Sequence, residues 1–462
     1  MSGAAEIRLK PTHRRTLALP WLLTALYLGP LHIAAAQAPA PAAQAADEEA
    51  DATAPPRRPT RPARPTFRFG VDGVLAEAAA LPDAPDASSL LTLRATPYAQ
   101  WQPARGWELR AGVRLGAVAQ RGGPSAYDDT QAELADTYVR YSRGDTRLTV
   151  GAQTVLWGRV DAVPLIDRVS RVDLSRIVLD DLAERRLPQP VVRWEQTIDD
   201  WKLDGVLLPY FRAAVLPDER SVWSPIDRRS GRVLGLPETP AIAAFARHAP
   251  VRERVDGSGG AAVRITRTGE PLDFGLTLAR TRQPLPYYRL NPAGPALDIV
   301  HPHNRFLGAD LEVVAGGVTY RSELGMTTDV PLTRPDGVMV DARAFDWIGA
   351  VEFFPGGKDT RVNVQLLVRK LRADAPVLEI TRYVGINGEV QTTLGQGRWK
   401  LGMKFFSGLN VHDLYLAPRL SFVGWEPHEL YVQAHHFRGE SRTLGGFYRE
   451  RGMLAIGLKT RF

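Results

Sequence analysis

The sequence predicts an all-β fold, a transmembrane barrel of antiparallel strands. Three observations predict it: hydrophobic residues alternate with polar ones, aromatic residues stand at the ends of the alternating runs, and the last run ends in Phe462. Alternation alone is also compatible with a soluble sandwich of two sheets. The aromatic positions and the terminal phenylalanine favour the membrane barrel, because barrels carry aromatic girdles at both lipid interfaces.

The clearest alternating run covers residues 107–119. A strand places successive residues on opposite faces, whereas a helix would scatter the same residues around its surface. The pattern recurs at residues 147–153, 272–278 and 361–369. Many runs are about 10–13 residues long, the length that a tilted strand needs to cross a bilayer.

Connections between the runs alternate in length. Residues 103–106, 144–145 and 199–200 form short turns, whereas residues 158–188 and 212–257 form long ones. Short periplasmic turns and long external loops produce this rhythm. Counting back from the carboxyl terminus predicts about 18 strands, with 16 as the alternative, and a barrel of that width encloses a water-filled lumen.

The amino-terminal residues 1–36 are predicted to be a cleaved signal peptide. Basic residues precede an apolar run at residues 17–33, and small residues follow it. Residues 37–65 consist largely of alanine, proline and charged residues, which predicts a disordered periplasmic spacer. Residues 66–462 then form the barrel, which we expect in the bacterial outer membrane.

Composition and motifs exclude several classes of function. The chain has no cysteine, which excludes a disulfide scaffold, a thiolate metal site and a cysteine nucleophile. Residues 1–36 contribute +3 of the net charge of +7, and the remainder is too dilute for nucleic-acid binding. The chain has no G-x-S-x-G motif, and His301 and His303 lack a carboxylate at ligand spacing. We therefore expect no cofactor, no metal and no enzyme, although a catalytic site built from scattered rim residues stays open as an alternative.

Charged residues of the predicted strands should face the lumen. An arginine on the lipid face at mid-membrane costs roughly 2–4 kcal/mol. The predicted pore-lining bases are Arg110, Arg114, Arg147, Arg361, Arg369, Lys400, Lys404 and Arg419. An excess of bases predicts a preference for anionic solutes. The alternative is that these bases pair with acids on neighbouring strands and only stabilise the wall.

The long connection at residues 157–190 is predicted to fold into the lumen and narrow it. Asp173 can cap a short helix there, with Leu174, Ile177, Val178 and Leu182 on one face. The predicted constriction residues are Arg159, Asp161, Asp167, Arg168, Arg171, Asp173, Arg176, Asp180 and Asp181. Acids opposite bases would create a transverse field that orients dipolar solutes. The alternative is an external loop that packs on its neighbours.

Several motifs carry a resemblance to a known family. They are Gly151-x-Gln153-x-x-x-Trp157-Gly158, Asp273-Phe274-Gly275-Leu276, Phe306-Leu307-Gly308-Ala309-Asp310 and residues 318–323. With these motifs the chain resembles an uncharacterised family of porin-like outer-membrane barrels that is distantly similar to alginate-export barrels. The resemblance covers residues 67–462. It implies export of lipid or polysaccharide beside an inner-membrane transporter, and it supplies no catalytic residues.

The function expected from the sequence is an outer-membrane channel for diffusion or partner-linked passage of small anionic or amphipathic solutes. The alternative is an export or adaptor barrel for lipid or polysaccharide that works with a periplasmic or inner-membrane transporter. The expected partners are outer-membrane lipid, such transporter components, and the barrel-assembly machinery, which would recognise the strand ending at Phe462. No nucleic acid is expected.

Overall fold

The computed structural model describes residues 65–161, 163–253, 255, 257–291, 296–357 and 359–460. The predicted signal peptide and all but the last residue of the predicted spacer lie outside the described residues. The same is true of Phe462, the residue on which the predicted assembly signal depends.

Nineteen strands of the described chain form one sheet that closes on itself. Strand β1 (Thr66–Ala80) pairs antiparallel with β2 (Ser89–Gln102) on one side and with β26 (Met453–Thr460) on the other. Strands β4 (Tyr127–Leu134) and β5 (Thr137–Arg143) both pair with β3 (Trp107–Arg121), so they are two halves of one barrel strand. The described chain is therefore a closed barrel of 18 antiparallel strands, as the sequence predicts.

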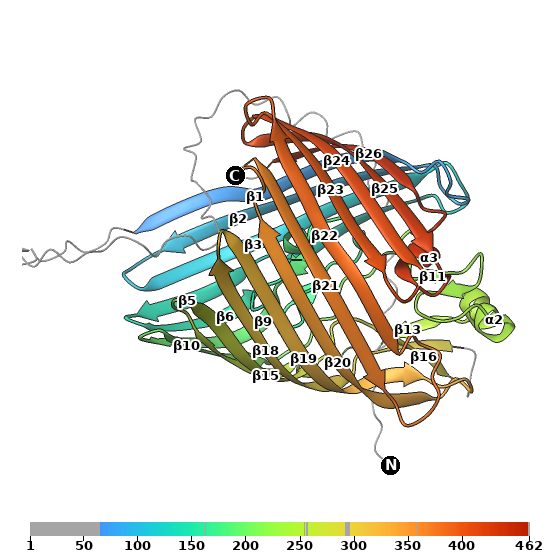
Figure 1. The fold of residues 1–462 in the computed structure, drawn as a ribbon, viewed down its shortest axis with the longest axis horizontal. Helices are drawn as coiled ribbons and strands as arrows, with labels where there is room; N and C mark the ends of the chain where they lie inside the picture. The colour runs from blue at the N-terminus through green and yellow to red at the C-terminus, as the bar shows by residue number, and fades with distance from the viewer. Residues whose placement is uncertain are drawn as a thin grey trace, which may run out of the picture. The chain divides into compact units, whose positions relative to one another are not determined.

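The remaining barrel strands follow one another around the wall (Figure 1). They are β6 (Thr146–Gln153), β9 (Gln189–Ile198), β10 (Trp201–Leu208), β14 (Gly260–Arg267), β15 (Leu272–Arg282), β18 (His303–Ala315), β19 (Val318–Thr333), β20 (Met339–Phe353), β21 (Thr360–Arg372), β22 (Arg382–Leu394), β23 (Trp399–Gly408), β24 (Asp413–Trp425) and β25 (His428–Gly439).

Shorter elements lie in the long connections. They are β7 (Arg171–Val172), α1 (Leu182–Arg185), β8 (Arg186–Leu187), β11 (Ile226–Asp227), β12 (Arg232–Val233), α2 (Pro240–His248), β13 (Val251–Glu253), β16 (Tyr287–Asn291), β17 (Ala296–Val300) and α3 (Leu444–Phe447). Among the residues that the structure describes, no helix is long and apolar enough to cross a membrane.

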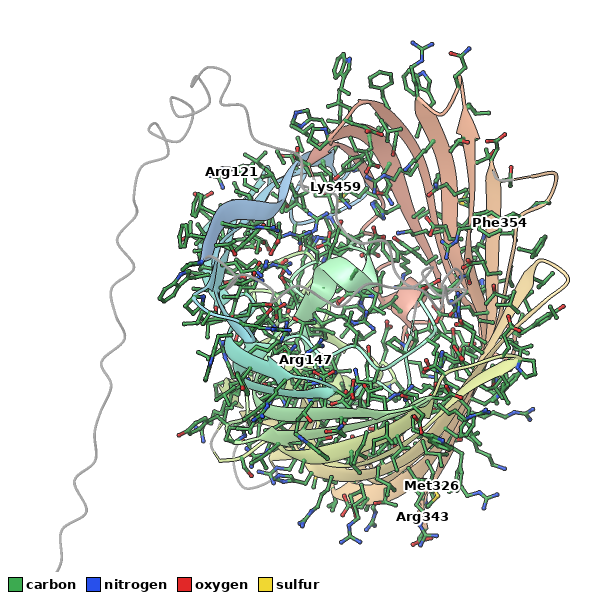
Figure 2. The ribbon with its side chains drawn as sticks, turned by 90° about the vertical axis from the view of Figure 1, so that its left-hand side faces the viewer. Arg121, Arg147, Met326, Arg343, Phe354 and Lys459 are labelled. Carbon is green, nitrogen blue, oxygen red and sulfur yellow. The ribbon has the colours of Figure 1, made fainter. Side chains whose placement is uncertain are left out.

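The two faces of each strand differ as the alternating sequence predicts. In β15, Leu276 and Leu278 point outward and are more than half exposed, whereas Thr277 between them is completely buried. Figure 2, a view along the barrel, shows side chains projecting both away from the ring of strands and into it. An apolar outer face and a polar inner face are what a barrel in lipid requires.

The two ends of the barrel also differ. The short turns lie at the end where β1 begins and β26 ends, whereas α2, β11, β13 and β16 gather at the opposite end (Figure 1). Exposed tryptophans mark the end with the short turns, namely Trp101, Trp107, Trp399 and Trp425. These positions agree with the aromatic girdle predicted from the sequence.

Candidate functional site: a segment inserted into the lumen

One long connection leaves the barrel wall partway along its height. Strand β6 ends at Gln153 and β9 begins at Gln189, and these two residues face each other in the β6–β9 ladder. Residues 154–188 between them, here called the inserted segment, contact side chains on the inner face of distant strands, as shown below. Figure 2 shows ribbon inside the ring of strands. The inserted segment therefore lies within the lumen, not over its outer rim.

The carboxylate of Glu323 on β19 holds the first part of the inserted segment. Its Oε1 accepts hydrogen bonds from the backbone N–H groups of Arg159 and Val160, at 2.6 and 3.1 Å. Its Oε2 accepts those of Leu165 and Ile166, at 2.6 and 3.2 Å. Glu323 is 0% exposed, so one wall carboxylate satisfies four buried backbone donors that water cannot reach.

Other side chains also fix the tight turn that Glu323 binds. Asp167 accepts hydrogen bonds from the backbone N–H groups of Trp157 and Gly158, both at 2.6 Å. A β-carbon at position 158 would collide with Pro164, so only glycine fits there. The Trp157 indole donates to Asp204 on β10 at 2.8 Å. These contacts fix both Trp157 and Gly158 against the inner face of the wall.

Arg159 extends from this turn to β18, the strand next to the one that carries Glu323. Its Nε lies 2.5 Å from Oδ1 of Asp310 on β18, and Asp310 also receives two hydrogen bonds from Arg264 on β14, at 2.6 and 2.9 Å. Asp310 is 4% exposed. Two arginines thus share one buried carboxylate, which ties the inserted segment to two neighbouring parts of the wall.

Arg176 is the centre of a second buried network, on the other side of the lumen. Its guanidinium lies 2.7 Å from Glu77 on β1 and 3.0 Å from Asp180, and it donates to the Thr92 hydroxyl on β2 at 2.8 Å. Asp180 in turn lies 2.6 Å from Arg94 on β2. Burial alone would raise the pKa of the Asp180 carboxyl, but the positive charges of Arg176, Arg94 and Lys459 outweigh burial and lower that pKa below its ordinary value. Asp180 is therefore a stable carboxylate at neutral pH.

Other acidic residues of the inserted segment also form ion pairs with the wall. Asp173 lies 2.9 Å from Arg114 on β3. Glu184 accepts two hydrogen bonds from Lys459 on β26, both at 3.0 Å, and Asp181 pairs with Lys404 on β23. The inserted segment is thus bound by charge to both sides of the seam between β1 and β26.

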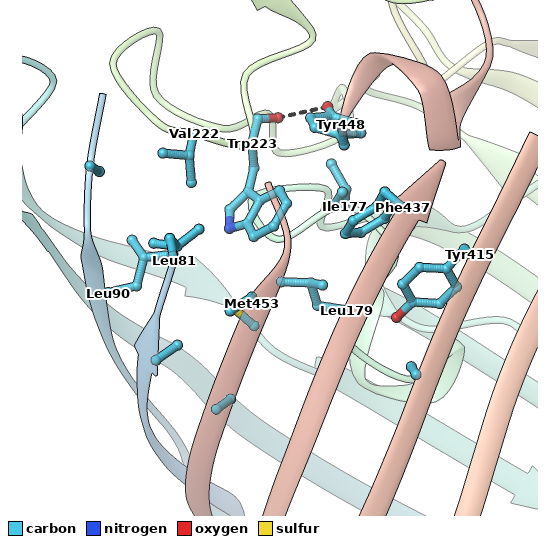
Figure 3. Close-up of a cluster of buried hydrophobic side chains, with 14 of the residues drawn as sticks. Leu81, Leu90, Ile177, Leu179, Val222, Trp223, Tyr415, Phe437, Tyr448 and Met453 are labelled. Carbon is cyan, nitrogen blue, oxygen red and sulfur yellow. Dashed lines mark hydrogen bonds between the residues drawn. The ribbon is translucent and has the colours of Figure 1, made fainter. Parts of the chain in front are cut away.

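Apolar side chains of the inserted segment also pack against the wall. Ile177 and Leu179 of the inserted segment pack in one buried cluster with Trp223, Tyr415 and Phe437, which come from a long connection and from two wall strands. Figure 3 shows this cluster, in which the Tyr448 hydroxyl donates to the backbone oxygen of Trp223 at 2.9 Å. This buried cluster therefore joins the inserted segment to wall strands and to a long connection.

The helix predicted to begin at Asp173 is wrong. The Asp173 carboxylate accepts a hydrogen bond from the backbone N–H of Ser175 at 2.9 Å, but residues 175–178 form turns. Ile177 adopts a φ of 47°, in the left-handed region that a right-handed helix cannot contain. The helix of the segment is α1, which follows Asp181 and spans only Leu182–Arg185. Contacts of Arg176 and Asp180 with the wall outweigh the local helical pattern.

All nine predicted constriction residues lie in the inserted segment. Besides the contacts above, Asp161 lies 3.0 Å from Arg361, Arg171 pairs with Glu133, and Asp167 pairs with Arg186. Arg168 lies 3.9 Å above the centre of the Phe306 ring, and burial lowers its pKa to about 10, so it stays charged at neutral pH. Asp161 is the most exposed of the acids among the nine.

All eight predicted pore-lining bases lie on the inner face of the wall. Arg114, Arg361 and Lys404 contact the inserted segment directly. Four others pair with wall acids: Arg110 with Asp72, Arg147 with Glu195, Arg369 with Asp346 and Arg419 with Glu429. Lys400 shares the face of Lys404 on β23. Most of these bases are therefore neutralised by nearby acids, and the anion preference stays a prediction.

A cavity of about 520 Å³ remains between the inserted segment and the wall strands β1, β2, β3 and β26. Its charged lining residues are Arg94, Arg114, Arg186 and Lys459 with Asp72, Asp136, Asp181 and Glu184. Bases and acids are equal in number, and the segment and the wall each contribute both kinds. In the described part of the chain, no three histidine, aspartate or glutamate side chains are grouped so that they could hold a metal ion.

The sequence pattern does not single out the wall carboxylates that hold the segment. Glu77 carries a signal that could have been used, because it is the one charged residue in the apolar run Val74-Leu75-Ala76-Glu77-Ala78-Ala79. Asp310 and Glu323 stand at the ends of two of the family motifs, but their partners are more than 45 residues away in sequence. Spacing along the chain cannot reveal such pairs.

A family model described as a protein of unknown function (DUF1302) matches residues 74–400. The chain belongs to this family. The match confirms the resemblance to an uncharacterised porin-like family. A search of the curated proteins finds no match.

Solved structures resemble the fold at low sequence identity. OccK5 (OpdH) of Pseudomonas aeruginosa has a TM-score of 0.50 and 10% identity, with 86% of this chain and 97% of that chain covered. OccAB1 of Acinetobacter baumannii has a TM-score of 0.51 and 9% identity, with coverage of 86% and 96%. The DUF1302 chain thus has the fold of a porin-like β-barrel.

Proposed function

We propose that this DUF1302 protein is a channel of the bacterial outer membrane that passes small charged or dipolar solutes. The observation that carries the proposal is the inserted segment, which narrows a lumen that would otherwise be wide. A barrel of this strand number is too wide for its own side chains to fill. A solute would pass through the cavity between the segment and strands β1–β3 and β26.

The cavity lining suggests which solutes would pass. Four bases and four acids surround the cavity, and they come from facing surfaces. Charges of opposite sign across a narrow, partly desolvated passage orient a solute that carries both charges. The equal number of acids and bases favours zwitterionic and dipolar solutes. The excess of basic residues in the sequence predicts simple anions instead.

The two ends of the barrel support an orientation. Strand β1 begins and β26 ends among the short turns, and the long connections lie at the other end. In outer-membrane barrels the short turns face the periplasm and the long loops face the outside. We therefore place the inserted segment so that it enters the lumen from the outer side.

Reconstitution in a planar bilayer tests the channel function. We expect discrete single-channel currents from the full protein, and a several-fold larger conductance after deletion of residues 173–187. The deleted part holds Arg176, Asp180 and Glu184, so its removal leaves the β1–β3 side of the lumen open. Equal conductance of the two proteins would show that the segment is not the constriction.

The export or adaptor function makes a different prediction for the same experiment. The many buried contacts of the segment are the observation that favours it, because a firmly held segment can close a pore until a partner displaces it. In that case the full protein would not conduct, whereas the deletion protein would. Absence of current from both proteins would contradict any channel function.

A further inference from the structure

Four arginines form a row on the outer face of the barrel. Arg280 on β15 faces Arg305 on β18 directly in the strand register, and Arg305 faces Thr328 on β19. On the strand after β19, Arg343 of β20 faces Arg372 of β21. The row therefore crosses five adjacent strands and contains two arginine pairs in direct cross-strand contact positions.

The row points toward lipid. Arg280, Arg305, Arg343 and Arg372 are all exposed, whereas Ala279, Thr327 and Ala344, which point the other way, are buried. Figure 2 shows Met326 and Arg343 on the outside of the ring of strands. All four arginines lie near the ends of their strands that lead into the long connections. They thus lie at the edge of the apolar band that is next to the long connections.

None of these four arginines has an ion-pair partner among the described residues. Among the described residues, no aspartate or glutamate lies within ion-pairing distance of any of the four arginines, although Arg372 lies 5.3 Å from the centre of the Phe345 ring. Like charges placed directly opposite each other on a sheet are destabilising. On the inner face, by contrast, nearly every predicted pore-lining base has an acidic partner. The row therefore suits an anion from outside the protein.

A shallow apolar groove adjoins the row. It has a volume of about 530 Å³, and Arg280 and Arg305 are among the residues that line it. Ala261, Leu278, Leu307 and Met326 line it on the outer face. The small side chain of Ala261 faces Arg280 in the β14–β15 register, which leaves the surface hollow there. An acyl chain can lie along such a groove while its charged head group stays at the arginines.

We propose that this row and groove bind a phosphorylated glycolipid of the outer leaflet, with its phosphates on the arginine pairs and an acyl chain in the groove. Guanidinium groups bind phosphate through paired hydrogen bonds, and two adjacent guanidiniums match a dianionic phosphate. Basic residues at a membrane surface also attract anionic lipids through the surface potential. The inference goes beyond the channel function and depends only on the end with the long connections facing outward.

Binding of lipid A to the detergent-solubilised full protein, measured by native mass spectrometry, tests the proposal. We expect the bis-phosphorylated form to bind, and binding to weaken about tenfold or more when the lipid lacks its phosphates or when the protein carries R280Q and R305Q. Without lipid, the melting temperature of this double variant should equal or exceed that of the parent protein, because a like-charge pair is removed. With lipid A, the melting temperature of only the parent should rise.

A matched control is the double variant R143Q/R438Q, which removes two exposed arginines that have no facing arginine. It should bind lipid A as the parent does. Equal binding by R280Q/R305Q, or equal binding of phosphatidylglycerol and lipid A, would overturn the proposal. So would a change of oligomeric state in R280Q/R305Q without any lipid binding, because the row would then be a contact between protein chains. Conductance is measured separately, so failure here leaves the channel function untouched.

Discussion

The guanidinium of Arg176 lies 2.7 Å from the carboxylate of Glu77, although 99 residues separate them in sequence. The two side chains join the inserted segment to the first strand of the barrel, and both are buried. The Tyr431 hydroxyl donates a further hydrogen bond to Glu77 at 2.6 Å. This ion pair therefore fixes the inserted segment to the wall of the barrel, and the position of the segment sets the width of the lumen.

Replacing Arg176 with methionine should loosen the inserted segment. Removal of one partner of a buried ion pair leaves an uncompensated charge and costs roughly 3–5 kcal/mol. We expect faster hydrogen exchange over residues 173–187 and a larger, noisier single-channel current. The control is Arg147→Met on the inner face, whose partner Glu195 is 3.8 Å away and whose side chain is 49% exposed. Glu195 is buried but keeps Arg193 and Lys202 as partners, so loss of the half-exposed Arg147 should cost less than about 1 kcal/mol. An equal effect of both variants would contradict this role of Arg176.

Replacing Glu323 with glutamine should release the turn at residues 159–166. The glutamine keeps one accepting oxygen, so two of the four backbone donors lose their partner, and each buried unsatisfied donor costs roughly 1–3 kcal/mol. Hydrogen exchange at Leu165 and Ile166, or at Arg159 and Val160, should accelerate. Glu312→Gln on the neighbouring strand is the control, because Glu312 pairs with Arg321 and not with the segment. Unchanged exchange in Glu323→Gln would show that the carboxylate does not hold the turn.

A single cysteine at Ala183 should report whether the cavity is on the conduction path. Ala183 lines the cavity, and the natural chain has no cysteine that would react in its place. We expect a charged thiol reagent added to the bilayer chamber to reduce the current of Ala183→Cys. Leu324→Cys, on the lipid-facing surface, should not respond. Full current after complete modification at position 183 would place the path elsewhere.

The conductance should be constant from neutral pH down to about pH 5. The folded-state pKa of Asp180 is lowered, so its stabilising contribution is complete above the ordinary carboxyl pKa of about 3.9 and is lost only as the pH falls below it. We therefore expect the segment to stay in place under mild acid and to loosen only in strong acid. Recording single-channel conductance between pH 3 and pH 8 checks this. A step near pH 6 would contradict the role of Asp180.

Part of the inserted segment was accessible to sequence reasoning. The mixture of charges at residues 157–190 predicts a segment that enters the lumen, and its nine predicted residues lie there. The helix at Asp173 was predicted wrongly, because the local apolar pattern contains no information about the contacts of Arg176 and Asp180 with Glu77 and Arg94. Those contacts fix the backbone in turns.

The sequence by itself determined the barrel, but it left 16 strands open beside 18, and the paired strands of the structure decided for 18. Alternation and turn length are properties of neighbouring residues, and lipid outside with water inside imposes them on every strand. Only the tertiary structure decided which charges meet. The pairs Asp310 with Arg159, Glu77 with Arg176, and Arg280 opposite Arg305 join parts of the chain that are not neighbours in sequence. Closure of the barrel brings these segments together, and no local pattern records the register in which it closes.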